Sequence, residues 1–273
     1  EPIIFCLFLI LILGISHGAL DNIKGKKLFK IFGCKSSVYF YLAYVIISVL
    51  IVASWLCFPN TVLFIFLVVA SYHFGKEDTV FSFKRKFLIS EFLFFLKGSS
   101  IILMPLLLKK AETIEIFRIL NFNVFESSIF TDQFLIMTLF LSFLSSLYIS
   151  QKKNANLIGI MVMDFFSLFI LNFFLTPVLA FTLYFCFLHS IRHSVKLIFE
   201  LDKSIKSGLR KFISRAIPLT LVTGVIFLLA IFFLNNFYKL DEAIYKVIFI
   251  GLASLTFPHI LLEYLLEKNE KAS

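Results

Sequence analysis

Long apolar runs separated by short polar segments constrain this chain more than any other feature. A helix needs about 20 apolar residues to cross the hydrocarbon core of a bilayer. We therefore predict an all-α, polytopic transmembrane helical bundle of about eight to nine spans, forming a single integral membrane domain over residues 1–273. The runs cover residues 2–20, 37–58, 61–74, 88–108, 133–150, 155–174, 178–199, 216–237 and 243–266.

Charge supports a membrane protein and orients it. Only 16% of the residues are charged, against about 25% in soluble domains. Most of the 26 Lys and Arg residues fall in alternate loops, chiefly 22–36, 75–87 and 200–215, and basic loops stay on the cytoplasmic side. We expect a multi-pass protein of the cell inner (plasma) membrane, with its N-terminus outside and its C-terminus cytoplasmic. The net charge of +9 is then a topology signal, and nothing indicates nucleic-acid binding.

All five histidines fall near the cytoplasmic side in this topology: His17, His73, His189, His193 and His259. His189 and His193 are four residues apart, so both project from one helix face and can reach one metal ion. Ionisable groups inside membranes are costly and usually functional. The five histidines therefore predict a shared intramembrane metal site.

Acidic residues follow three of these histidines at a fixed spacing. The segments SHGALD, YHFGKED and TFPHILLE place Asp21, Glu77 and Glu263 four positions after a histidine, and Asp78 follows Glu77. A metal-bound imidazole usually donates its second ring N–H to a carboxylate or a carbonyl. We therefore expect these four acids close to the ligands, where they would orient them.

The residues alone leave the metal open. Neutral imidazole ligands suit ferrous iron, copper or zinc, and two histidines from facing helices could also hold a haem. A metalloprotease is disfavoured because HSIRH lacks the glutamate of HExxH.

Four segments, GISHGALD, SYHFGKED, FLHSIRHS and LTFPHILLE, resemble the motifs of a known family in the same order along the chain. It is the Brp/Blh family of bacterial and archaeal β-carotene 15,15′-dioxygenases, which supply retinal to microbial rhodopsins. The resemblance implies a membrane enzyme that splits the central double bond of β-carotene with dioxygen at a non-haem Fe(2+), giving two retinal. It implies His17, His73, His189 and His193 as the iron ligands. It places His259 close to them, as an outer group or an additional ligand.

The substrate of such an enzyme is a long hydrocarbon, so its binding must come from apolar and aromatic surface. Aromatic residues beside the histidines are therefore candidates for the wall of a substrate tunnel: Tyr72, Phe74, Tyr184, Phe185, Phe187 and Phe257. The expected partners are β-carotene, dioxygen and the lipid bilayer, with the product passed to a microbial rhodopsin.

Two other classes of function remain open at this point. A histidine-dependent membrane transporter, or a quinone or haem electron carrier, would use histidines and acids as a proton relay. Glu91, Lys97 and Asp164, which lie within the apolar runs, favour that interpretation. A structural role as an accessory to a rhodopsin is the third hypothesis.

Overall fold

A computed structural model of the chain describes residues 2–18, 20–33, 36, 38–79, 88–151 and 156–270, and every element in these ranges is helical. The all-α prediction is therefore confirmed. The side chains of residues 16, 17, 88, 156, 157 and 270 lie outside the description. The chain divides into two compact units, which are described one at a time: unit 1 is Glu1–Cys6 with Pro59–His189, and unit 2 is Leu7–Phe58 with Ser190–Ser273. Helix α1 (Pro2–Leu9) contributes residues to both.

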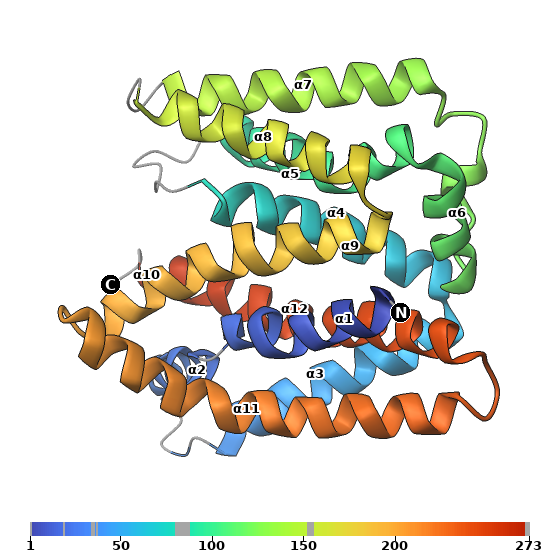
Figure 1. Ribbon diagram of the computed structural model, residues 1–273. Coiled ribbons are helices and arrows are strands. Elements are labelled where there is room, and N and C mark those ends of the chain that lie inside the picture. The colour runs from blue at the N-terminus through green and yellow to red at the C-terminus, as the bar shows by residue number, and fades with distance from the viewer. Residues whose placement is uncertain are drawn as a thin grey trace. The chain divides into compact units, whose positions relative to one another are not determined.

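Unit 1 is built on four long helices that pack as neighbours (Figure 1). Helix α5 contacts α4, α7 and α8, and α6 follows directly after α5. A proline begins α4, and Pro177 is the first residue of α9, where its missing N–H costs no helical hydrogen bond. The elements are α4 (Pro59–Glu77), α5 (Leu88–Leu108), α6 (Lys110–Ile119), η3 (Val124–Glu126), α7 (Asp132–Gln151), α8 (Asn156–Phe174), α9 (Pro177–Leu183) and the π-helix η4 (Tyr184–Ser190).

Two glycines bring α4 and α5 into backbone contact. A Cβ atom at Gly75 would lie 1.8 Å from the carbonyl oxygen of Phe94, and one at Gly98 would lie 1.8 Å from the carbonyl oxygen of Ser71. Neither position has room for a side chain, as is typical where membrane helices approach closely. Lys97, which precedes Gly98, is thereby held beside the C-terminal end of α4.

Unit 2 centres on α12, which packs against α3, α2 and α11. Leu28, Phe40, Leu262 and Leu266 form one buried cluster among α2, α3 and α12. A second buried cluster lies between α10 and α11. The elements are the π-helix η1 (Ile10–Gly14), the 3-10 helix η2 (Ile15–Gly18), α2 (Asp21–Ile31), α3 (Val38–Cys57), α10 (Ile191–Leu201), α11 (Ile205–Leu234) and α12 (Leu240–Glu270).

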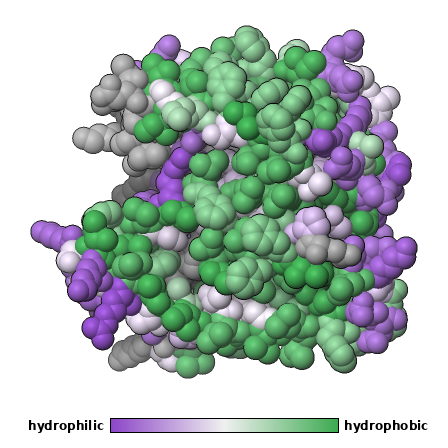
Figure 2. All heavy atoms as spheres, in the orientation of Figure 1, coloured by the Kyte–Doolittle hydropathy of each residue, from purple (hydrophilic) through white to green (hydrophobic). Residues whose placement is uncertain are grey.

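The surface has the character of a protein that lies in lipid. On the face shown in Figure 2, hydrophobic side chains cover the flanks of α7, α8 and α11, and hydrophilic ones gather around α6 and the two ends of α11. Leu221, Leu229 and Phe232 on α11 are all more than half exposed. Large apolar side chains exposed in such number along one helix indicate contact with a membrane.

Within the described residues, six helices are long and apolar enough to cross a bilayer. They are Val38–Cys57, Ile89–Leu108, Asp132–Gln151, Pro177–Leu201, Ile205–Leu234 and Leu240–Asn269. The segments Pro2–Gly14 and Ile158–Phe174 are apolar but shorter. Helix α4, which contains the predicted run 61–74, ends in the segment YHFGKE, which carries His73, Lys76 and Glu77. The six helices support the membrane prediction, whereas the count of eight to nine stays a prediction.

Some boundaries differ from those expected. Helix α11 begins at Ile205, inside the segment expected to be a basic loop, and residues 110–119 of the expected outer loop form α6. The basic residues between 80 and 87 and those at 152 and 153 lie outside the described residues.

Candidate metal centre

A π-helical turn, η4, carries His189 in unit 1. Its i→i+5 hydrogen bonds bring residues five apart onto one face, whereas in an α-helix such residues point about 140° apart. Tyr184 and His189 are five apart, and both contact the same carboxylate, that of Asp78. Local π-helices often occur at functional sites, and here the π-turn directs two side chains at one acid.

Asp78 follows the C-terminal end of α4 and receives several donors. His189 Nδ1 lies 2.8 Å from Asp78 Oδ1, and the Tyr184 hydroxyl also donates to this carboxylate. Burial alone would raise the pKa of Asp78, but the His189 imidazole, the Lys97 charge and the Tyr184 hydroxyl together lower it below its usual value. With Nδ1 directed at Asp78, Nε2 is the ring nitrogen of His189 that can bind a metal.

His73 lies beside His189 in an aromatic environment. The two imidazole rings meet edge to face with centroids 5.4 Å apart, and both side chains are buried. Phe74 contacts the His189 ring at 4.6 Å between centroids, and Phe185 stacks on it at 5.8 Å. Two of the predicted ligands therefore lie side by side, and aromatic rings shield one of them.

A small cavity lies beside Asp78 within unit 1. Its volume of about 20 Å³ is enough for roughly one water molecule. Lys97 reaches it from α5 and donates from Nζ to Thr79 Oγ1 at 3.0 Å. Half of its lining residues are polar or charged, namely Asp78, Lys97, Ser100, Ser146, Asp164 and Tyr184.

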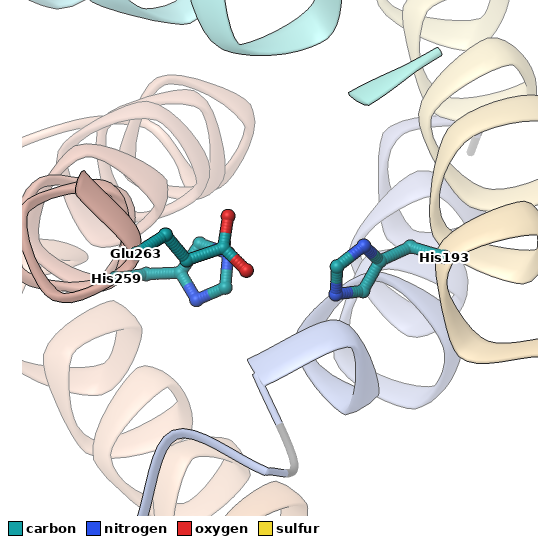
Figure 3. A group of neighbouring side chains, drawn as sticks. All are labelled: His193, His259 and Glu263. Atoms are coloured by element: carbon teal, nitrogen blue, oxygen red, sulfur yellow. The ribbon is translucent and has the colours of Figure 1, made fainter. Parts of the chain in front are cut away.

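Unit 2 holds a second group of donors. His193 extends from α10, and His259 and Glu263 extend from α12 toward it (Figure 3). One ligand atom from each of the three residues lies within 4.8 Å of the others, and both histidines are buried. Two imidazoles and one carboxylate form the donor set of many non-haem iron oxygenases.

Three further residues hold this group in place. His259 Nδ1 lies 2.8 Å from Asp21 Oδ1, and the Tyr44 hydroxyl lies 3.1 Å from Asp21 Oδ2. Lys24 forms a salt bridge of 2.8 Å with Glu263, whose other oxygen lies 3.8 Å from His259 Nε2. Burial alone would lower the pKa of Lys24, but Glu263 raises it above its usual value. Asp21 thus orients His259 as Asp78 orients His189.

The other predicted site residues are distributed as follows. His17 belongs to η2, and its side chain lies outside the described part of the chain. Glu77 is the last residue of α4, and Phe257 is half-buried in α12. Tyr72 donates a hydrogen bond to Glu91, and Phe187 is 46% exposed on η4.

Tyr44 and Lys24 were not predicted from the sequence to take part in the site. Both contact acids distant in the chain, Asp21 and Glu263, and no spacing pattern connects them to a histidine. The sequence indicated Lys97 only as a charged residue within an apolar run, with no predicted place at the metal site.

The residues fit a metal ion by the chemistry of their donors. Neutral imidazole nitrogens bind a divalent ion such as zinc at about 2.0–2.1 Å. Adjacent imidazoles such as those of His73 and His189 can provide ligands of this kind. A carboxylate on the opposite ring nitrogen, as at His189 and His259, is the usual companion of a metal-bound histidine.

Comparison with known proteins gives a consistent result. The model of a family described as beta-carotene 15,15′-dioxygenase matches residues 8–267, a range that includes all five histidines. A protein named Beta-carotene 15,15′-dioxygenase, from uncultured marine bacterium 66A03, is 28% identical over 263 residues, covering 94% of this chain and 90% of the relative. No solved structure matches the chain.

Proposed function

We propose, from the premise that this chain belongs to the β-carotene 15,15′-dioxygenase family, that it cleaves β-carotene at the central 15,15′ double bond with dioxygen and releases two molecules of retinal. The observation that carries the proposal is the family match over residues 8–267. The buried carboxylate–imidazole pairs support it, because they suit metal-dependent chemistry. The family match favours an enzyme over a transporter or an electron carrier.

We further propose ferrous iron as the cofactor, held by His17, His73, His189 and His193. The adjacent buried rings of His73 and His189 support this ligand set from within unit 1. When bound, the iron would activate dioxygen for addition across the double bond. Asp78 would keep the proton of His189 on Nδ1, so that Nε2 presents its lone pair.

A different ligand set is suggested by unit 2. There His193 lies near His259 and Glu263, so these two residues are candidates for additional ligands. A metal measurement separates the two schemes. If His259 is an outer group, His259→Ala retains iron at reduced affinity, about 10 to 100-fold lower. If His259 is a ligand of the essential ion, the variant loses its iron.

The aromatic residues would bind the substrate and exclude water. β-Carotene is a hydrocarbon without polar groups, so its affinity for the protein must come from apolar contact. Phe74 and Phe185 lie against the His189 ring, where they would face a hydrocarbon at the reacting centre. Tyr72, Tyr184, Phe187 and Phe257 remain proposed wall residues of the substrate tunnel.

Retinal formation provides the direct test of function. The chain is expressed in cells that make β-carotene, and the extract is assayed for retinal. We expect retinal from the wild-type protein and none from His73→Ala. Asn172→Ala is a matched control, because Asn172 is equally buried but donates only to the Leu168 carbonyl in its own helix. Absence of retinal from wild-type protein that accumulates in the membrane would refute the activity.

The remaining proposals concern placement in the cell. We propose a plasma-membrane protein of eight to nine spans in one membrane domain, with the N-terminus outside and the C-terminus cytoplasmic, whose product passes to a microbial rhodopsin. Single cysteines test the topology in a background from which the four native cysteines have been replaced. A probe at Lys26 should resist an impermeant thiol reagent in intact cells, and one at Glu115 should react. The opposite labelling pattern would reverse the orientation.

A further inference from the structure

Lys97 carries a positive charge at a buried position in an apolar helix, where an unpaired cation is unfavourable. It lies within the apolar span Ile89–Leu108 on α5, and it is only 8% exposed. Charged residues within membrane helices are rare and usually face partners in the protein interior. The retinal-forming reaction proposed above makes no direct use of this charge.

The contacts of Lys97 lead to Asp78. Its Nζ donates to Thr79 Oγ1 at 3.0 Å, and the Thr79 hydroxyl donates in turn to the Gly75 carbonyl at 2.7 Å. This arrangement fixes the ammonium group at the C-terminal end of α4. Asp78 is the residue directly before Thr79 and lines the same cavity as Lys97, which places the ammonium group close to its carboxylate.

Asp78 in turn contacts a histidine that is a predicted metal ligand. Its carboxylate accepts a hydrogen bond from His189 Nδ1 at 2.8 Å. A buried carboxylate needs compensating charge or donors to remain a good acceptor. Lys97 supplies the nearby positive charge, and Tyr184 supplies a further donor.

We infer that Lys97 is a positioning residue for the metal-binding imidazole of His189, acting through the carboxylate of Asp78. The inference rests on the proposed function in one respect, the assignment of His189 as a ligand. The close approach of α4 and α5 at Gly75 and Gly98 is what allows a lysine on one helix to serve an acid at the end of the other.

Metal binding by the purified protein in detergent tests this without any turnover. Co(2+) replaces ferrous iron as the probe, because its absorption spectrum reports on the geometry of its ligands. Lys97→Met should weaken Co(2+) binding by about tenfold and change the spectrum, whereas Lys97→Arg should restore most of both by keeping the charge. Ser99→Ala is the matched control, since Ser99 is buried on the same helix and donates only to the Leu96 carbonyl.

A double-mutant comparison separates positioning from a general structural role. If Lys97 acts through Asp78, adding Lys97→Met to Asp78→Asn should produce no further loss of Co(2+) affinity. An equal loss in both backgrounds, or unchanged binding by Lys97→Met alone, would overturn the inference. The comparison of Asp78→Asn with the double variant decides the matter even if Lys97→Met alone does not accumulate.

The Co(2+) measurements and the retinal assay can fail independently of each other. Wild-type protein that makes no retinal, yet loses Co(2+) affinity on Lys97→Met and regains it on Lys97→Arg, would refute the proposed reaction and support the positioning role. Retinal formation with Co(2+) binding indifferent to Lys97→Met would support the reaction and overturn the positioning role. Since Lys97 acts on the metal ligand, the KM for β-carotene of the iron-loaded variant should stay near that of the wild type.

Discussion

Replacing Gly98 by alanine should disrupt the contact between α4 and α5. The added Cβ would lie 1.8 Å from the Ser71 carbonyl oxygen, whereas ordinary van der Waals contact begins at 3.4 Å, so the helices must separate by about 1.6 Å. The other close atoms, Gly75 N and the Ser71 carbonyl carbon, also belong to the backbone. None of them can rotate away.

The expected cost follows from this geometry. Overpacking a close-packed interior costs about 1–3 kcal/mol, and the upper end applies here because only a helix shift relieves the clash. Alanine returns up to about 1 kcal/mol through its better helix propensity. We therefore expect a net loss of about 2 kcal/mol, which corresponds to a fall of roughly 4–8 °C in the unfolding midpoint. Retinal formation should also decline, because α4 carries His73 and leads to Asp78.

The assay is thermal unfolding in detergent, followed by the loss of monodisperse protein, alongside retinal yield. Gly159→Ala is the matched control, since Gly159 lies on α8 with no atom within 4 Å of its added Cβ. That variant should be as stable as the wild type or slightly more so. If Gly98→Ala matched Gly159→Ala in both measurements, the backbone contact between α4 and α5 would be refuted.

Three further predictions concern the histidine sites and one surface acid. His189→Ala should abolish retinal formation while the protein stays in the membrane, and full activity with bound iron would remove His189 from the ligands. Asp21→Asn should weaken metal binding by about 10 to 100-fold, because the group that accepts from His259 loses its negative charge, measured by iron titration; unchanged affinity would show that Asp21 does not orient a metal ligand. The hydrogen bond from Lys211 lowers the pKa of Asp202, so its ionised form stabilises the fold above about pH 4, and this contribution is lost as the pH falls toward the folded-state pKa. Wild-type protein should therefore lose more thermal stability than Asp202→Asn between roughly pH 6 and pH 3, and parallel curves would contradict this.

The spacing of acids in the sequence indicated the right residue types but not all of their partners. Asp21 and Glu263 each follow a histidine by four positions, and Glu263 does lie near His259. Asp21, however, contacts His259, which lies 238 residues away. His189 meets Asp78, a carboxylate 111 residues earlier in the chain. Helical periodicity predicts only neighbours on one helix, whereas these pairs depend on which helices pack together.

The sequence by itself determined that this chain is helical and apolar enough for a membrane, because a bilayer requires long runs of apolar residues whose backbone hydrogen bonds are satisfied within each helix. It also supplied the ordered histidine motifs through which the family could be identified. Only the tertiary structure decided that Tyr44 and Lys24 contact the acids beside His259, and that Lys97 reaches Thr79 next to Asp78. It also decided that a π-turn directs Tyr184 and His189 at one carboxylate. The physical reason is that a hydrogen bond or an ion pair requires contact within a few ångströms, and such contact between distant segments is set by helix packing rather than by local spacing.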